Sequence, residues 1–227
     1  MTEHYCAHHV PMFQSLSQDH LNKINNAVIH TTYQKGEQLS SPYNSVGLFI
    51  IYKGQVKEYQ LSISGKEQLL RLIGPGEMVG EQTLFSDEEP QTYIEAISPL
   101  SVCLLRREDF KEIIFESPMI AMEMLSELNQ RLKETEKQTM RIATESVRSR
   151  LASFLLDLVE AQESTSFELP FSMKELASYL ATTPETISRR LKEMEEEGYI
   201  QRQGRQININ DLDAFSNYVF NLKEDPL

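Results

Sequence analysis

The sequence of 227 residues has only two cysteines, and it contains no long apolar run. Two cysteines are too few for a disulfide scaffold, an all-cysteine zinc site or a four-thiolate iron–sulfur cluster within one chain. No apolar run approaches the roughly 18 residues that a membrane span requires. The amino-terminal MTEHYCAHHVP contains no basic region followed by an apolar run, which predicts no secretion signal. We therefore expect a protein of the reducing cytoplasm that does not enter a membrane.

The chain also has fewer basic than acidic side chains. The chain has 22 basic and 34 acidic residues, which gives a formal net charge of −12. This balance argues against a protein that coats nucleic acid without sequence specificity. The hydrophobic content of 40% and the charged content of 25% are ordinary for a folded protein, so wholesale disorder is excluded. The length allows one or two domains, each with a core.

Enzymatic motifs are missing as well. The sequence contains no Ser/His/Asp or Cys/His constellation in a usable order, no glycine-rich phosphate loop and no metalloprotease motif. We therefore expect a protein that is not an enzyme.

Glycine is almost absent from the middle of the chain. Seven of the nine glycines lie before residue 81, and more than a hundred residues separate them from Gly198 and Gly204. Because glycine marks tight turns, the front is predicted to form short strands and the middle to form helices. Apolar or alternating runs indicate strands at residues 46–52, 55–61 and 66–73, and two more within residues 91–105. This spacing predicts a small antiparallel sandwich or barrel, preceded by a helix near residues 17–28.

A change of period at Pro118 predicts a long helix. Ser117 can cap this helix, and Pro118 suits its first turn. Its apolar and threonine positions recur in steps of four and three, which is typical of a helix that pairs with another helix. These seam positions are Ala121, Leu125, Leu128, Leu132, Thr135, Thr139 and Ile142. We expect this helix to join two copies of the chain, with packing inside its own domain as the alternative.

Residues 171–209 have the pattern of two short helices followed by a hairpin. Residues 172–175 (SMKE) form a capping box, which starts one helix. Thr183 can cap a second helix, with Pro184 at its first position and Gly198 just beyond its end. The sequence after Gly198 indicates a hairpin that turns at Gly204. A helix–turn–helix with an attached hairpin is a winged helix, which binds DNA.

The second helix separates apolar from polar side chains. At about 100° per residue, Ile187, Leu191 and Met194 fall on one face, which needs a core. The opposite face carries side chains that can hydrogen-bond to base edges, with phosphate-binding candidates beside it. The DNA-binding candidates are Thr183, Glu185, Thr186, Ser188, Arg189, Arg190, Lys192 and, in the hairpin, Arg205.

The alternative for this segment is an ordinary helical hairpin with a solvated charged face. Residues 172–205 contain six basic and six acidic side chains, so their net charge is 0 while the whole chain carries −12. The segment is therefore much less acidic than the rest of the protein, which favours DNA binding.

A glycine-punctuated β-unit, a long helix and a winged helix in this order resemble the Crp/Fnr family of bacterial transcription regulators. The resemblance is most specific at residues 74–81 (GPGEMVGE), which are similar to the family's β-roll cassette, and at residues 183–191, which are similar to its recognition helix. The pattern of Glu185, Ser188 and Arg189 is typical of the Fnr branch and implies TTGA-type half-sites in an inverted repeat. The resemblance also implies a homodimer that contacts RNA polymerase.

The implied fold is α+β, with a cyclic-nucleotide-binding-type β-roll, a long dimerisation helix and a C-terminal winged helix-turn-helix domain. We assign residues 1–117 to the β-roll sensor with its N-terminal arm, 118–145 to the dimerisation helix and 146–227 to the DNA-binding domain.

The effector is where the sequence departs from the family's pattern. Members that bind cyclic AMP have an arginine after the cassette that neutralises the cyclic phosphate, but residue 91 here is Gln, which argues against cyclic AMP. Oxygen-sensing members carry an N-terminal cysteine cluster for a four-iron cluster, which a single Cys6 excludes in its usual form. No cofactor is therefore assigned. The candidate effector-pocket residues are Gly80, Glu81, Gln91, Thr92 and Thr135.

The two cysteines offer another signal. Some Fnr-like proteins of low-GC Gram-positive bacteria, including lactic acid bacteria, have one N-terminal and one β-roll cysteine, and the resemblance implies a dithiol–disulfide redox switch for Cys6 and Cys103. A thiolate near partly protonated histidines oxidises more readily. Two alternatives remain: Cys103 is only a small core residue, or Cys6, His8 and His9 bind a metal or haem together with ligands from elsewhere.

Together these patterns predict a homodimeric, sequence-specific DNA-binding transcription regulator whose activity a Cys6/Cys103 switch tunes. The alternative is a Crp-like regulator that is constitutive, or that responds to a small molecule or a metal. A signal can switch such a protein only if it interacts differently with its two states. The expected partners are double-stranded DNA, a second copy of the chain and RNA polymerase.

Overall fold

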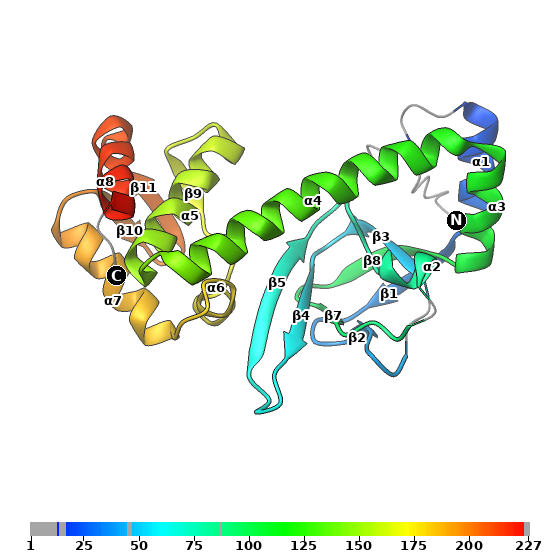
Figure 1. Ribbon diagram of the computed structural model, residues 1–227, viewed down its shortest axis with the longest axis horizontal. Coiled ribbons are helices and arrows are strands. Elements are labelled where there is room, and N and C mark those ends of the chain that lie inside the picture. Colours follow the sequence, from blue (N-terminus) through cyan, green and yellow to red (C-terminus); the bar gives the residue numbers. More distant parts are fainter. Residues whose placement is uncertain (1–12, 14–16, 45–46, 87, 225–227) are drawn as a thin grey trace. The chain divides into compact units, whose positions relative to one another are not determined.

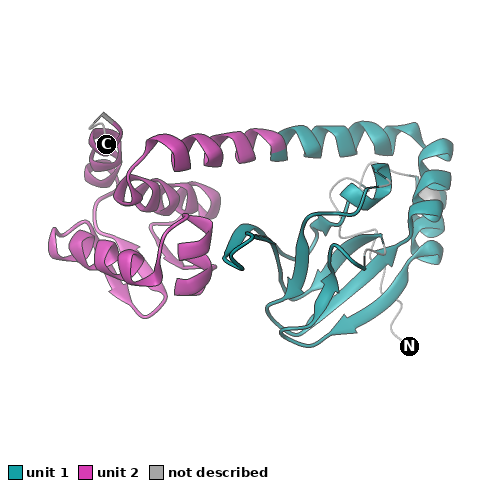
Figure 2. Ribbon diagram, turned by 60° about the horizontal axis from the view of Figure 1, so that its bottom comes forward, with its two compact units in different colours: residues 1–131 teal, residues 132–227 magenta. Residues whose placement is uncertain are grey.

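The computed structural model describes residues 13, 17–44, 47–86 and 88–224. The chain forms two compact units, which are residues 1–131 (unit 1) and residues 132–227 (unit 2) (Figure 2). The boundary between them falls within one continuous helix, α4 (Pro118–Thr144). Our division of the sequence at residues 117 and 145 remains a prediction.

Unit 1 is built on two antiparallel sheets of four strands each. The first sheet has the order β1 (Ile29–Tyr33), β8 (Leu100–Leu105), β3 (Leu48–Lys53), β6 (Met78–Val79). The second has the order β2 (Gln38–Ser40), β7 (Tyr93–Ala96), β4 (Val56–Leu61), β5 (Glu67–Ile73). The antiparallel sandwich expected from the strand spacing is therefore confirmed.

Strand β3 is apolar from Leu48 to Ile51 because both of its faces are buried there. Successive side chains of a strand point to opposite faces. Phe49 and Ile51 belong to the core that also contains residues of the second sheet, such as Ile94. Leu48 and Ile50 belong to a second core, which packs against helices.

Helices supply the other side of that second core. They are α1 (Gln18–Ala27), α3 (Arg107–Glu116) and the first part of α4, with the short α2 (Gln82–Phe85) nearby. Figure 1 shows α1 and α3 side by side at one end of unit 1, where they contact each other. Ile24, Phe110 and Ile120 are almost completely buried among the helices and the first sheet.

The cassette at residues 74–81 links β5 to α2 through the short strand β6, with a tight turn at Gly80. Gly80 has a φ of +92°, which side-chain-bearing residues rarely adopt, and a Cβ there would collide with the carbonyl oxygen of Gly47. The glycine is needed because the chain must turn sharply against a neighbouring backbone. This turn places Glu81 at the start of α2.

Unit 2 contains the remaining helices and a small sheet. Its helices are the end of α4, α5 (Val147–Gln162), α6 (Met173–Tyr179), α7 (Pro184–Glu196) and α8 (Leu212–Glu224). The sheet has the order β10 (Ile200–Gln203), β11 (Gln206–Ile209), β9 (Ser166–Glu168). The predicted helix–turn–helix and hairpin are confirmed, whereas strand β9 and helix α8 of unit 2 were not predicted.

Among the residues that the structure describes, no helix combines the length and the apolar character needed to cross a membrane.

Candidate nucleic-acid interface

Helix α6 starts at a complete capping box. The Ser172 hydroxyl accepts from the backbone N–H of Glu175 (3.3 Å), and the Glu175 carboxylate accepts from the backbone N–H of Ser172 (2.8 Å). These two bonds satisfy backbone donors that a helix start would otherwise leave unpaired. Leu176 and Ala177 anchor the helix in the core of unit 2.

A short turn then leads into α7. Ala181 has a φ of +52°, an uncommon conformation for a residue with a side chain, and it reverses the chain after α6. The Thr183 hydroxyl caps α7 by accepting from the backbone N–H of Thr186 (3.3 Å), and Pro184 occupies the first turn. Cap and proline together set where α7 begins.

Helix α7 buries one face and exposes the other. Ile187, Leu191 and Met194 are completely buried. The opposite side is an exposed polar surface, which we call the reading face and which consists of Glu185, Ser188, Arg189 and Lys192. The structure therefore brings together the side chains that we predicted to reach base edges.

Ion pairs on α7 lie towards its carboxyl end. Arg190 Nη1 lies 2.7 Å from the Glu193 carboxylate, and this hydrogen bond contributes most to lowering the pKa of Glu193. Arg189 is held only loosely, with Nε 3.9 Å from Glu193 and 63% of its side chain exposed. Arg189 can therefore leave this contact for a DNA base at little cost.

Glu185 lies in the first turn of α7 and remains ionised. Its pKa is lowered chiefly by a hydrogen bond from its own backbone N–H, and also by the Thr183 hydroxyl. The amino terminus of a helix favours negative charge. Glu185 therefore presents acceptor oxygens only, as readout of a cytosine amino group would require.

Arg205 has a structural partner in the hairpin. Its Nε and Nη2 donate to the carbonyl oxygen of Leu169 at 3.1 and 2.5 Å, and Nε lies 3.4 Å from the Glu168 carboxylate. These contacts tie the hairpin turn to the segment that follows β9. A DNA contact by Arg205 would compete with them and remains a prediction.

The effector-pocket candidates lie in different surroundings. Glu81 is 7% exposed and Thr92 is 4% exposed, whereas Gln91 is exposed and donates to the carbonyl oxygen of Glu89. Gly80 lies in the tight turn described above, and Thr135 is exposed on α4 in unit 2. Only Glu81 therefore combines burial with a charge.

Two arginines that the sequence analysis missed hold Glu81. Arg71 Nη2 lies 3.1 Å from the Glu81 carboxylate, and Arg131 on α4 also pairs with Glu81. Arg71 Nε lies 2.5 Å from Glu58. Burial disfavours the charged form of Arg71, but the negative charges of Glu58 and Glu81 have a larger effect. The pKa of Arg71 is therefore raised. The sequence did contain a signal for Arg71. It lies two residues after Leu69 and two residues before Ile73, which are both buried, so the alternation of strand β5 places its charge on the inward face.

Cys103 is fully buried on β8 and is disulfide-bonded, so the described part of the chain contains no free thiol. Its Sγ lies 3.4 Å from Nδ1 of His30. Cys6, His8 and His9, the other residues of the predicted redox and metal sites, lie outside the described residues. Within residues 13, 17–44, 47–86 and 88–224, no group of three or more His, Cys, Asp or Glu side chains could hold a metal ion.

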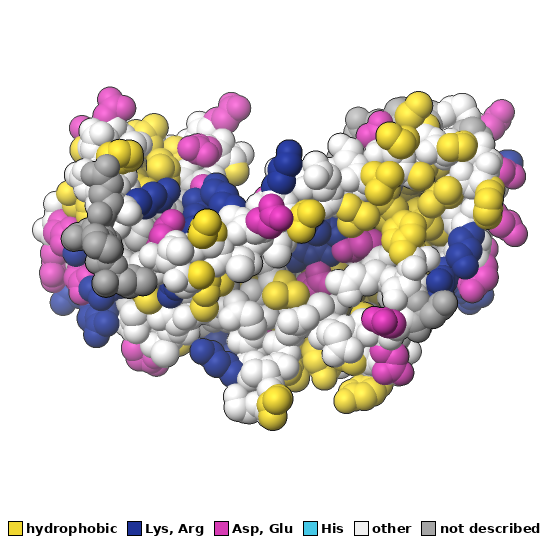
Figure 3. All heavy atoms as spheres, viewed as in Figure 1, with side chains coloured by type: hydrophobic (Ala, Val, Ile, Leu, Met, Phe, Trp, Pro, Cys, Tyr) yellow, Lys and Arg dark blue, Asp and Glu magenta, His cyan; other side chains and the backbone are white. Residues whose placement is uncertain are grey.

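Helix α4 exposes an apolar stripe. Large side chains at its outward positions are more than half exposed, and Figure 3 shows apolar side chains gathered over the part of α4 in unit 1. The exposed residues are Met119, Met122, Leu125, Leu132 and Met140, with Phe115 just before the helix. Leu128, another position of the predicted seam, is partly buried and packs against the core of unit 1.

These observations define a class: a β-sandwich of the cyclic-nucleotide-binding type joined by a long helix to a winged helix. The Cyclic nucleotide-binding domain family matches residues 30–117, and the Crp-like helix-turn-helix domain family matches residues 149–218. The chain is 35% identical over 217 residues to the "Probable transcriptional regulator flp" of Lacticaseibacillus casei, covering 96% of this chain and 99% of that protein. The chain belongs to the Crp/Fnr family of DNA-binding transcription regulators.

Two further relatives extend this similarity. The chain is 28% identical to the cyclic AMP receptor protein of Thermus thermophilus, over 77% of this chain and 80% of that protein. The solved structure of FixK2 from Bradyrhizobium japonicum has the same fold, with a TM-score of 0.73 and 24% identity over 84% of this chain and 96% of that chain.

Proposed function

We propose that the protein acts as a homodimer on an inverted repeat of DNA, with one reading face in each half-site. The observation that carries this proposal is the division of α7 into three fully buried apolar residues and an exposed row of Glu185, Ser188, Arg189 and Lys192. A recognition helix enters the major groove, where each base pair presents a distinct pattern of donors and acceptors. The implied half-sites are of the TTGA type.

The apolar stripe of α4 supports the homodimer. Leu125 is 59% exposed and Leu132 is 56% exposed, and both occupy positions of the predicted heptad seam. Two identical stripes can cover each other across a two-fold axis, and a two-fold protein matches an inverted repeat. Contact with RNA polymerase follows only from family membership.

Arg189→Ala tests the reading face. We expect a loss of about 1–3 kcal/mol in binding at one base position, with relaxed specificity there, because a bidentate contact to guanine is removed. Fluorescence anisotropy should compare a TTGA inverted repeat with repeats substituted at single positions. Arg106→Ala in unit 1 is the matched control, since Arg106 is exposed and lies far along the chain from α7. Equal losses on all DNA sequences would assign Arg189 to phosphate contact only.

For regulation we propose a redox switch that involves Cys6 and Cys103. Support comes from the disulfide-bonded state of Cys103, which lies on the face of β8 that packs against α1, α3 and α4. A change at this sulfur acts on the core that holds the start of α4, the proposed dimer helix.

The second candidate is a regulator whose β-roll needs no effector. It is favoured by Glu81, whose carboxylate is already neutralised by Arg71 and Arg131. Together with the uncharged Gln91, this pairing argues against cyclic AMP as the ligand. Such a regulator would bind its operator equally well with and without oxidant, cyclic nucleotides or metals. The operator affinity of the redox regulator would instead change with oxidant.

A further inference from the structure

A groove of about 500 Å³ lies within unit 2, between α4, α5 and the end of α6. Neither the DNA-reading face nor the redox proposal uses it. Its lining residues are Glu134, Lys137, Gln138, Arg141, Ile142, Arg150, Phe154, Asp157, Glu160, Ala161, Tyr179 and Leu180. Its volume lies in the range of small-molecule sites.

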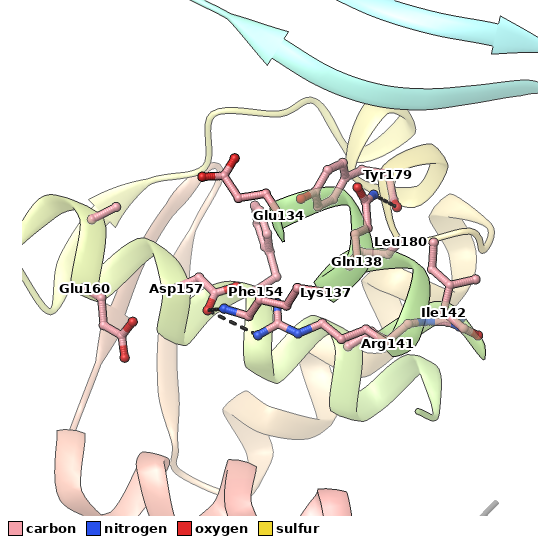
Figure 4. Close-up of a pocket in the computed structure, with 12 residues that line it drawn as sticks. Glu134, Lys137, Gln138, Arg141, Ile142, Phe154, Asp157, Glu160, Tyr179 and Leu180 are labelled. Carbon is pink, nitrogen blue, oxygen red and sulfur yellow. Dashed lines mark hydrogen bonds and ion pairs between the residues drawn. The ribbon is translucent and has the colours of Figure 1, made fainter. Parts of the chain in front are cut away.

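Most polar groups in the groove already have partners (Figure 4). Asp157 pairs with Arg141 (2.5 Å) and with Lys137 (3.1 Å). The Gln138 side chain donates to the carbonyl oxygen of Tyr179 (3.1 Å). Arg141 and Lys137 therefore each have an ion-pair partner, although both share the single carboxylate of Asp157.

Arg150 is the exception. It is 8% exposed, and its Nη1 donates to the carbonyl oxygen of Ile142 (3.0 Å), whereas Nε is buried without a hydrogen-bond partner. Among the residues that the structure describes, no carboxylate pairs with Arg150. Burial lowers the pKa of Arg150, and the negative charge of Glu145 opposes this effect only in part. A buried guanidinium without a direct ion-pair partner is costly and favours the binding of an anion.

The other walls of the groove favour an anion with an apolar body. Phe154 and Tyr179 form an aromatic pair with ring centroids 5.7 Å apart, and Leu180 and Ile142 add aliphatic surface. Glu134 and Glu160 also line the groove, and in Figure 4 both carboxylates point away from the ion pairs of Asp157. Their negative charges disfavour a ligand with several charges.

On α4, residues 134, 137, 138, 141 and 142 line the groove. At about 100° per residue the first four positions lie on the side of α4 opposite to Leu125 and Leu132, whereas Ile142 is a position of the predicted heptad seam.

We propose that this groove binds a small organic monocarboxylate, whose carboxylate pairs with Arg150 and whose apolar body packs against Phe154 and Tyr179. A carboxylate can accept two parallel hydrogen bonds from one guanidinium, and Arg150 has unused donors. The pairing supplies the direct ion-pair partner that Arg150 lacks among the described residues.

Benzoate and benzamide on the full-length protein test this proposal. The two compounds have nearly the same shape and differ in charge. Isothermal titration calorimetry should give a dissociation constant on the order of 1 mM for benzoate, and benzamide should bind at least about tenfold more weakly because it lacks the charge. Inorganic phosphate, which has no apolar body, should not compete with benzoate at equal concentration. Equal binding of benzoate and benzamide, or full competition by phosphate, would overturn the proposal.

Two variants locate the site. Arg150→Gln removes the guanidinium, and Ala161→Phe fills the groove from an exposed position without touching Arg150. Both should abolish benzoate binding, whereas Arg106→Gln in unit 1 should leave it unchanged. Because Arg150→Gln also removes the hydrogen bond to Ile142, circular dichroism must show that it folds. If Arg150→Gln does not fold, the test rests on Ala161→Phe and on the comparison of benzoate with benzamide. Unchanged benzoate binding by Ala161→Phe would refute the site.

Discussion

At the scale of single residues, side-chain caps and ion pairs determine the shape of unit 2. Thr183 caps α7, the Ser172–Glu175 box caps α6, and Asp157 joins α5 to α4 through Arg141 and Lys137. Each contact satisfies backbone donors or charges that the fold would otherwise leave unpaired.

Thr183→Ala should lower the free energy of unfolding by about 1 kcal/mol, because the backbone N–H of Thr186 loses its acceptor. Urea denaturation followed by circular dichroism measures this loss. Thr182→Ala is the matched control, since Thr182 is the neighbouring threonine and does not cap α7. Equal destabilisation by both variants would show that the cap contributes nothing specific.

Asp157→Asn should lower stability at neutral pH by about 1 kcal/mol. Burial by itself would raise the pKa of Asp157. The hydrogen bond and the positive charge of Arg141, together with those of Lys137, have a larger effect, so the pKa of Asp157 is lowered. A lowered pKa in the folded state means that the stabilisation is present above the ordinary aspartate pKa of about 3.9 and is lost as the pH falls through the folded pKa.

The difference in stability between the parent and Asp157→Asn should therefore shrink on acidification, as measured by urea denaturation at several pH values. Glu160→Gln, on the same helix and exposed, is the control and should show no such dependence. A difference that stays constant down to low pH would mean that the ion pairs do not stabilise the fold.

At the scale of elements, α4 packs on one side and is exposed on the other. Ile120 and Met124 are buried in the core of unit 1, and Leu128 is partly buried there, whereas Leu125 and Leu132 are exposed. The same helix therefore anchors unit 1 and offers an apolar surface to a second copy.

The double variant Leu125→Ser/Leu132→Ser should convert dimers to monomers without unfolding unit 1, because both side chains are already exposed. Size-exclusion chromatography with light scattering measures the mass. Leu128→Ser should instead lower the stability of unit 1 by about 1–2 kcal/mol, because it removes a partly buried apolar side chain. A double variant that stays dimeric would disprove the assignment of this surface.

At the scale of the whole molecule, a signal has to alter how the chain binds DNA. The proposed route starts at Cys103, whose side chain packs in the core shared by α1, α3 and α4.

Oxidation with diamide should change operator affinity of the parent protein by about tenfold, within the usual range of coupling between two sites. Cys6→Ser should lose this response, while the reduced variant keeps the operator affinity of the reduced parent. Fluorescence anisotropy under controlled redox conditions measures both. A full response in Cys6→Ser would remove the switch and favour the constitutive regulator.

Local patterns in the sequence were enough to predict strands β3, β4, β5, β7 and β8 of the sandwich, the winged helix and the reading face, but not strands β1, β2 and β6. The reason is that caps, glycine turns and apolar periods act over a few residues, so that Thr183, Gly204 and the spacing of Ile187, Leu191 and Met194 specify their elements directly. Family membership was foreseen from the same motifs, together with the order of the units.

Only the tertiary structure decided which distant side chains meet. It placed Arg71 and Arg131 on Glu81, turned Leu128 towards the core, tied Arg205 to Leu169 and left the Nε of Arg150 buried without a hydrogen-bond partner. Such contacts depend on strand register and on the packing of helices that are far apart in the sequence. A local period can show that a side chain lies on an inner face, but not which charge or cavity it finds there.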